Sequence, residues 1–176
     1  MRYGAAVLIR DKTAEDTKAC AVLMRLTHHS DGYPRYLMDD LEGFITSAAE
    51  LAGWVVEDGG EIVGHLAVHA IEGDPTWESA HAATGLPPER LAVVARLMVH
   101  PRIRRRGMAR QLLQTASAWA EKQGRRLVLD VLQESDDAIA LYRRLGWRGI
   151  GAVTLPVNRR PDLQLDVFLA PDSPVR

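Results

Sequence analysis

The chain has 176 residues, of which 47% are hydrophobic and 26% charged, and its formal net charge is −1. This composition is typical of a globular protein, and the near-neutral charge argues against nucleic-acid binding or attachment to an anionic membrane. The single cysteine, Cys20, excludes an intrachain disulfide and a thiolate metal cluster. No apolar run approaches the roughly 18 residues of a membrane span. We therefore expect one cytoplasmic domain over residues 1–176, with Cys20 buried on a helix.

The N-terminal part of the chain predicts a strand and two helices. Ala5–Arg10 is a short β-type run, and Thr13 begins a helix that we expect to end near Leu26. The segment His28–Pro34 contains glycine and proline and therefore predicts a loop. Apolar residues at helical spacing then predict a second helix over Tyr36–Glu50.

The next segment predicts a hairpin followed by a long connection. Two strands, Gly53–Glu57 and Ile62–Ala70, flank an Asp-Gly-Gly turn, which is a strong hairpin pattern. In the connection, Asp74 can cap a short helix that ends at Gly85. Because the connection is long for a hairpin, we expect it to shape a site rather than only to join strands.

The second half alternates strands and helices. Four strands and two helices are predicted over Leu91–Val99 (strand), Gly107–Gln123 (helix), Arg126–Leu132 (strand), Asp136–Leu145 (helix), Trp147–Leu155 (strand) and Leu163–Leu169 (strand). Hairpins followed by a βαβ crossover indicate an α/β fold with a mixed sheet and helices on both faces.

An arginine-rich turn joins the strand that ends at Val99 to the helix that follows Gly107. A turn that leads into a helix N-terminus presents free backbone amides and is an anion site. Five arginines surround this turn and favour a ligand with several phosphates: Arg102, Arg104, Arg105, Arg106 and Arg110. A solvated basic turn and a nucleic-acid patch are the alternatives.

The turn does not match two common phosphate-binding motifs. It lacks the Lys and the Ser or Thr of a P-loop, and it has one glycine, Gly107, where a dinucleotide-binding turn needs three. The remaining pattern is R-x-x-G-x-A, formed by Arg104, Gly107 and Ala109. Its two small residues allow a pyrophosphate to approach the backbone closely.

Two flanking segments give this turn a family resemblance. The apolar strand Leu97-Met98-Val99 precedes it, and the sequence SDDAIALYRRLGW follows at Ser135–Trp147. Together with the turn they resemble the GNAT family of N-acetyltransferases, over about Leu91–Gly149. The resemblance implies about seven mostly antiparallel strands with a central, splayed parallel pair, and helices on both faces.

The resemblance also implies a role for particular residues. The pyrophosphate of acetyl-CoA would lie on the turn and the start of its helix, and the pantetheine arm would pair with the strand backbone before it. The amide of Leu97 would face the thioester oxygen, and Tyr142 would protonate the leaving thiolate. Ser135 replaces a frequent asparagine. The cofactor-binding residues implied are Leu97, Met98, Val99, Arg104, Arg105, Arg106, Gly107, Met108, Ala109, Arg110, Ser135 and Tyr142.

The sequence departs from the family pattern at two points. Arg105 stands where the first glycine of the turn is usual. The segment Leu91–Ala95 has no ionisable side chain, whereas many relatives carry a glutamate there as general base. The base therefore stays open among four candidates, which are Asp130, Glu78, His65 and His69.

These residues support an acetyl-CoA-dependent acyltransferase that acetylates a primary amine of a small or amino-acid-like acceptor by direct attack. An idle acyl-CoA-binding module of the same fold is the alternative. No metal is expected, because His65 and His69 have strand spacing but no evident third ligand. No nucleic-acid or membrane partner is expected, and the resemblance is compatible with a homodimer.

Overall fold

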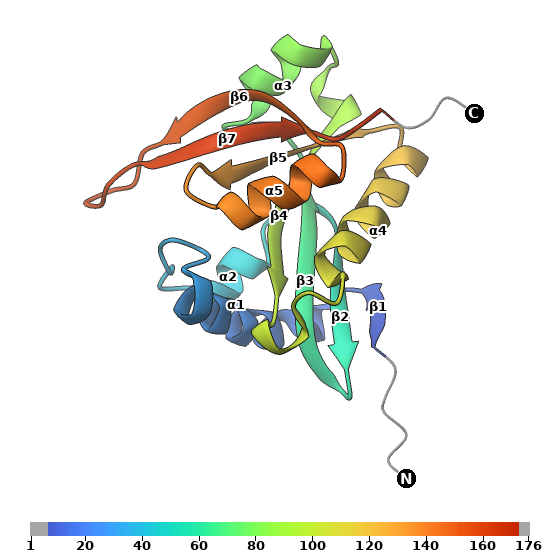
Figure 1. Ribbon diagram of the computed structural model, residues 1–176, viewed down its shortest axis with the longest axis vertical. Helices are drawn as coiled ribbons and strands as arrows, with labels where there is room; N and C mark the ends of the chain where they lie inside the picture. Colours follow the sequence, from blue (N-terminus) through green and yellow to red (C-terminus); the bar gives the residue numbers. More distant parts are fainter. Residues whose placement is uncertain (1–6, 173–176) are drawn as a thin grey trace. The chain divides into compact units, whose positions relative to one another are not determined.

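The computed structural model describes residues 7–172 and contains a mixed sheet (Figure 1). Its seven strands are β1 (Leu8–Asp11), β2 (Glu50–Asp58), β3 (Glu61–His69), β4 (Leu91–Val99), β5 (Arg126–Leu132), β6 (Arg148–Leu155) and β7 (Leu163–Leu169). They are hydrogen-bonded in the order β1-β2-β3-β4-β5-β7-β6. The central pair, β4 and β5, is parallel, with a register from Leu91↔Arg126 to Val94↔Leu129. This confirms the predicted seven-stranded sheet with a central parallel pair.

Most element boundaries follow glycines and capping residues that are visible in the sequence. The helices are α1 (Thr17–Asp31), α2 (Leu41–Ile45), α3 (Trp77–Thr84), α4 (Met108–Lys122) and α5 (Asp136–Arg144). Gly85, Gly124 and Gly146 follow α3, α4 and α5 with φ of 67°, 64° and 82°, and glycine adopts this left-handed conformation without the clash of a Cβ. The first strand begins at Leu8, while Ala5 and Ala6 lie outside the described residues.

Two predictions for the N-terminal part are wrong. The helix begins with a short 3-10 turn at Ala14–Asp16 and continues to Asp31, so it includes the two histidines that were expected in a loop. His28 and His29 occupy its last turn, where carbonyls are unpaired, and Gly32 ends it at φ 71°.

The helix predicted over Tyr36–Glu50 is reduced to the five residues of α2. Asp40 caps it by accepting a hydrogen bond from Gly43 N at 2.8 Å, so the chain before it is not helical. Glu50 already belongs to β2 and pairs with His69 of β3. The apolar residues at helical spacing in this segment belong partly to the short helix α2 and partly to the loop before it, and both pack against the core of α1.

The described chain divides into two compact units. The first contains the residues up to His69 together with Ala95–Ala116, and the second contains Ala70–Val94 and the residues from Ser117 onward. In the first unit, α1 and α2 pack against β2 and the end of β4. Its core consists of Cys20, Ala21, Leu23, Met24, Leu41, Ile45, Val55 and Met98.

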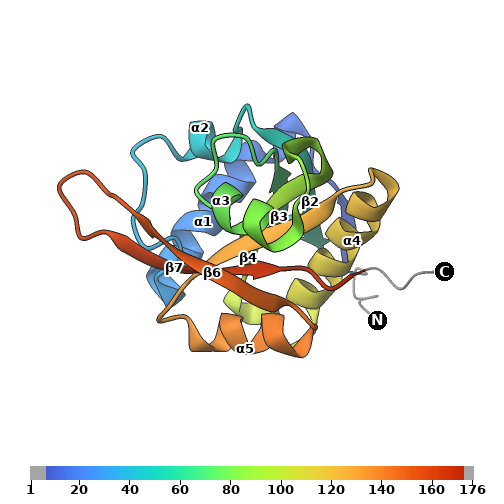
Figure 2. The same cartoon turned by 90° about the horizontal axis from the view of Figure 1, so that it is seen from above.

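The second unit has helices on both faces of its strands, as Figure 2 shows for α3 and α5 on opposite sides of β6 and β7. Val167 and Leu169 of β7 pack in a cluster with Ala80 of α3. Phe168, between them, points to the other face and contacts Tyr142 of α5, with ring centroids 6.2 Å apart. This alternation confirms the expectation of helices on both faces. Among residues 7–172, no helix is long and apolar enough to cross a membrane.

Candidate functional site

The arginine-rich turn has a defined backbone structure. After β4, the Nδ1 atom of His100 accepts a hydrogen bond from Arg102 N at 3.1 Å, and a 3-10 turn spans Pro101–Ile103. Ile103 is 1% exposed and anchors this turn in the core. The chain then enters α4, where Gln111 N donates to Gly107 O at 3.0 Å. The backbone amides of the first turn of this helix precede that bond and have no partner within the helix.

Two residues of the turn have left-handed backbone conformations, Arg105 at φ 60° and Gly107 at φ 77°. Alternation of right- and left-handed residues turns successive amides toward a common point and forms an anion-binding concavity. The positive φ at Arg105 also explains why glycine is usual at this position in the resembling family, because a non-glycine residue there costs about 1 kcal/mol or more.

The arginines around the turn divide into two groups. Arg102 pairs with Glu61 at 2.6 Å, and Arg104 pairs with Asp31 at 2.6 Å and donates to Val99 O at 3.2 Å. These two side chains therefore hold the turn against the β2–β3 hairpin and α1. In contrast, three arginines are exposed and form no ion pair within residues 7–172: Arg105, Arg106 and Arg110.

The strand before the turn contains a backbone irregularity that was not expected from the sequence. Arg96, which precedes Leu97, has φ 54° within β4. Its carbonyl accepts a hydrogen bond from His65 Nδ1 at 2.9 Å. Leu97 and Val99 are half-buried, whereas Met98 packs in the core at 2% exposure. The one feature of the sequence that could have indicated this irregularity is a charged residue, Arg96, inside an otherwise apolar strand.

The two remaining predicted residues belong to the second unit. Ser135 precedes α5, and its carbonyl accepts a hydrogen bond from Ile139 N at 3.0 Å. Tyr142 is 8% exposed, and its ring lies 6.1 Å from that of Trp147. Trp147 is buried in the core at 5% exposure.

Comparison with known families then decides the assignment. The model of the Acetyltransferase (GNAT) family matches residues 18–147, which is well over half of the chain. The chain belongs to the GNAT acetyltransferase family. A comparison with curated proteins finds no match.

Several solved structures share the fold of this chain. The N-acetyltransferase from Staphylococcus aureus Mu50 has 18% identity and a TM-score of 0.68, with 94% of this chain and 98% of that chain covered. Arabidopsis thaliana NAA60 in complex with acetyl-CoA has 17% identity and a TM-score of 0.69, with 93% and 97% covered. The structure of yncA from Salmonella typhimurium with its cofactor acetyl-CoA has 17% identity and a TM-score of 0.68, with 97% of each chain covered.

The candidate bases of this GNAT protein differ in their environments. Asp130 is half-buried on β5, and burial, with a smaller contribution from Asp74, raises its pKa to about 6. Glu78 is exposed in the first turn of α3. His65 and His69 are 0% and 8% exposed. Burial lowers the pKa of each to about 4, so both imidazoles are neutral at pH 7.

The histidine pair forms part of a polar cluster in the first unit. Arg96 Nη1 lies 2.7 Å from His69 Nε2. The Arg96 guanidinium stacks over Phe44, with its central carbon 4.0 Å from the ring centroid. His65 Nε2 and Arg96 Nε are buried without a hydrogen-bond partner. The shared strand face of the two histidines was predictable from their spacing, whereas the contact with Arg96 was not.

Cys20 lies inside α1, away from solvent. Cys20 is 0% exposed, which confirms that it is buried on a helix. Burial raises the pKa of its thiol to about 12, so a reactive thiolate is not formed at neutral pH. Among the residues that the structure describes, no three His, Cys, Asp or Glu side chains come together as a metal site.

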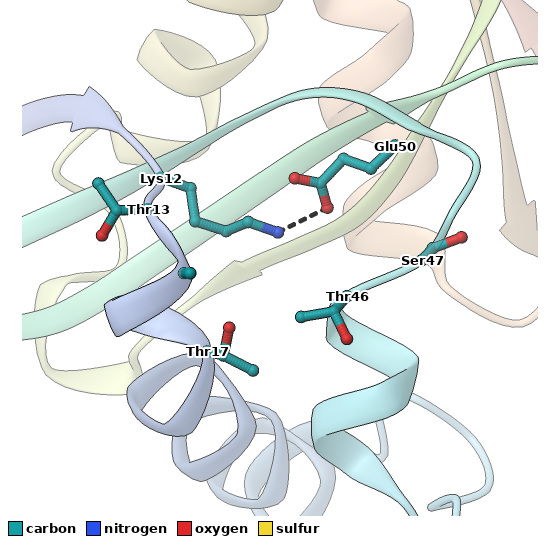
Figure 3. A pocket seen from close by; sticks show the side chains of 7 residues that line it. Lys12, Thr13, Thr17, Thr46, Ser47 and Glu50 are labelled. Carbon is teal, nitrogen blue, oxygen red and sulfur yellow. Dashed lines mark hydrogen bonds and ion pairs between the residues drawn. The ribbon is translucent and has the colours of Figure 1, made fainter.

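A hollow of about 330 Å³ lies in the first unit between the start of α1 and the loop after α2 (Figure 3). Lys12 and Glu50 point toward each other across it and form an ion pair of 2.5 Å. Thr13, Thr17, Thr46 and Ser47 also line it. The hollow does not include the residues of the arginine-rich turn.

Proposed function

We propose that this protein is an acetyl-CoA-dependent N-acetyltransferase that acetylates a primary amine of a small-molecule or amino-acid-like acceptor. The observation that carries the proposal is the turn before α4, where the first amides of the helix, which have no intrahelical partner, adjoin the exposed Arg105, Arg106 and Arg110. A pyrophosphate fits this arrangement, because a Cβ built at Gly107 meets nothing closer than Gln111 Nε2 at 4.0 Å. The family membership and the relatives with acetyl-CoA support the same donor.

In this proposal the amine attacks the thioester directly while both substrates are bound. A C–N bond forms, the C–S bond breaks, the amine loses a proton and the thiolate gains one. The backbone N–H of Leu97 donates to the thioester oxygen, a contact worth roughly 3–4 kcal/mol in the transition state. The hydroxyl of Tyr142 donates the proton to the thiolate. Leu97 and Tyr142 are thus the proposed catalytic residues.

The acceptor amine also requires deprotonation. For an amine of pKa about 10.4 this costs roughly 4.6 kcal/mol at pH 7. Asp130, whose pKa is raised to about 6, and the neutral His65 are the candidate proton acceptors supported by their environments. His69 is a weaker candidate, because its Nε2 lies 2.7 Å from Arg96 Nη1 and accepts from it. Glu78 remains a candidate from the sequence alone.

The remaining expectations are part of the same proposal. The family match runs through both compact units, and β4 and α4 contribute residues to each, which supports one acetyltransferase domain over residues 1–176. We also propose a cytoplasmic location, without nucleic-acid or membrane partners, and a homodimer. An idle acyl-CoA-binding module is the second candidate, favoured by Ser135 and by the lack of an ionisable side chain in Leu91–Ala95.

Acetyl-CoA is expected to raise the Tm of the protein, because a ligand that binds only the native state stabilises it; at 100 times Kd the gain is about 2.7 kcal/mol. Differential scanning fluorimetry with acetyl-CoA measures this effect, and S-acetylpantetheine, which lacks the phosphates, is the comparison ligand. Release of thiol in the presence of a panel of amines then separates an enzyme from an idle module. No shift at millimolar acetyl-CoA would contradict the proposal.

Tyr142→Phe is expected to lower kcat by about 10²-fold, within the range of a lost general acid, with little change in acetyl-CoA affinity. The phenylalanine ring retains the packing against Trp147 and Phe168. Steady-state kinetics and a calorimetric Kd measure the two quantities separately. An unchanged rate of acetyl transfer in a single turnover would remove the acid role of Tyr142.

A further inference from the structure

Arg96 is a half-buried cation whose direct contacts are uncharged. It contacts His69 Nε2 at 2.7 Å and the face of Phe44 at 4.0 Å. The guanidinium keeps its charge in proteins, so His69 must act as the neutral hydrogen-bond acceptor. Buried charges are normally paired with an opposite charge. Within residues 7–172, however, no carboxylate forms an ion pair with Arg96.

Glu50 is an acidic neighbour of this cluster, but its carboxylate is paired with Lys12. It lies opposite His69 in the β2–β3 register and acts electrostatically on Arg96. Its side chain turns toward Lys12, and the two form an ion pair of 2.5 Å (Figure 3). Because Lys12 and Glu50 neutralise each other and the histidines are neutral, the cluster retains the positive charge of Arg96.

The three nitrogens of the Arg96 guanidinium have different surroundings. Nη1 contacts His69, and Nε is buried. Nη2 makes no hydrogen bond or ion pair to the residues that the structure describes. The edge formed by Nη1 and Nη2 can therefore receive an external anion, and a planar carboxylate matches the fork of a guanidinium. Stacking on Phe44 holds the plane of that fork.

The location of Arg96 connects this anion site with acyl transfer. Arg96 directly precedes Leu97, whose amide we propose as the contact of the thioester oxygen, and its positive φ interrupts β4 at this point. Tyr33 also acts electrostatically on Arg96, so the loop after α1 borders the same cluster. A carboxylate bound by Arg96 would lie beside the proposed contact of the thioester, so an acceptor that carries its amine close to its carboxylate would suit both contacts.

We infer that Arg96, stacked on Phe44 and contacting His69, binds the carboxylate of the acceptor, and that the acceptor is an amino acid or a closely related amino carboxylic acid. This inference rests on the proposed acetyltransferase function and specifies its substrate class. Arg96 is then a substrate-binding residue, and Phe44 and His69 are positioning residues.

The test compares two matched acceptor pools in a thiol-release assay with acetyl-CoA. One pool contains the standard α-amino acids, and the other contains the corresponding α-amino amides, which lack the carboxylate charge. We expect kcat/KM for the acid pool to exceed that for the amide pool by at least about tenfold, since a charged hydrogen-bonded contact is lost in the amides.

Variants at Arg96 assign this preference to its guanidinium. Arg96→Asn tolerates a positive φ and is expected to bring the acid-to-amide ratio to about one, with the Kd of acetyl-CoA unchanged. Arg96→Lys keeps the charge without the planar fork and should give an intermediate ratio. Lys18→Gln, which removes an exposed cation of α1 in the same unit, is the matched control and should leave the ratio unchanged.

The outcomes separate this inference from the proposed function. If acetyl-CoA binds but both pools react equally, if neither pool reacts, or if Arg96→Asn keeps the wild-type ratio, the carboxylate site is refuted while donor binding stands. If acetyl-CoA does not raise the Tm, the proposed function fails and this inference fails with it. If Arg96→Asn does not unfold cooperatively, the acid-to-amide ratios of kcat/KM for Arg96→Lys and Phe44→Leu test the site instead. Wild-type ratios in both of these variants would refute the carboxylate site.

Discussion

Replacement of Gly107 by alanine is expected to weaken acetyl-CoA binding by at least about tenfold, and Gly107→Val by about 10²-fold. Gly107 has φ 77°, and an added Cβ has room in the protein itself, since its nearest neighbour is Gln111 Nε2 at 4.0 Å. The added carbon therefore acts on the ligand, because it stands where a pyrophosphate would approach the amides at the start of α4. Calorimetric titration with acetyl-CoA measures the change in Kd.

Gly124→Ala is the matched control for this prediction. Gly124 follows the other end of α4 and has φ 64°, and its added Cβ would lie 3.9 Å from Arg90 Nε. Both alanine variants should therefore lose a similar stability, about 1–2 kcal/mol, from the left-handed backbone. Acetyl-CoA affinity should fall only in Gly107→Ala. Equal Kd values for the two variants would show that the turn before α4 does not bind the phosphates.

The parts of the fold that could be predicted are those with local signals. The β2–β3 hairpin has a Gly59-Gly60 turn with both φ values positive, at 63° and 87°, and a two-residue turn of this kind fixes the pairing of its strands. Gly124 and Gly146 follow α4 and α5, which end within one residue of their predicted ends at Gln123 and Leu145. In these cases the conformation depends on residues within one turn of the boundary, so the sequence is sufficient.

The segment from Tyr36 to Glu50 could not be predicted because its structure depends on distant contacts. Its helical spacing is real for Leu41 and Ile45, which are buried in the first unit. Glu50, by contrast, is fixed by its β-register with His69 and by its ion pair with Lys12. A hydrophobic pattern cannot indicate which of its members will pair with a strand from elsewhere in the chain.

The candidate site shows the same division. The turn around Gly107 could be recognised because its small residues and arginines are adjacent in sequence. The cluster around Arg96 could not, because His65, His69 and Phe44 come from separate elements and meet Arg96 only in the folded first unit. No turn-forming residue lies next to Arg96 in the sequence, so its positive φ could not be predicted.

Acidification from pH 6.5 to pH 4 is expected to remove roughly 3–4 kcal/mol from the free energy of unfolding. Burial lowers the pKa of His65 and His69 to about 4 from the ordinary 6.5. Between pH 6.5 and pH 4 the unfolded chain binds protons that the folded protein does not. Each histidine therefore lowers the free energy of unfolding by up to about 1.4 kcal/mol for every unit by which the pH is lowered. The two groups together would remove roughly 6–7 kcal/mol.

Asp130 opposes this loss over part of the same range. Its pKa is raised to about 6 in the folded protein, against 3.8 in the unfolded chain, so its protonation stabilises the fold as pH falls from 6 toward 3.8, by roughly 3 kcal/mol at most. Because the two effects have opposite signs, chemical unfolding at pH 7, 6.5, 5 and 4 can test them in paired variants. His69→Gln, whose amide oxygen can still accept from Arg96, should reduce the slope, whereas Asp130→Asn should steepen it. A wild-type stability that stays constant from pH 7 to 4, or the same slope in both variants, would show that the histidines are not held neutral by the fold.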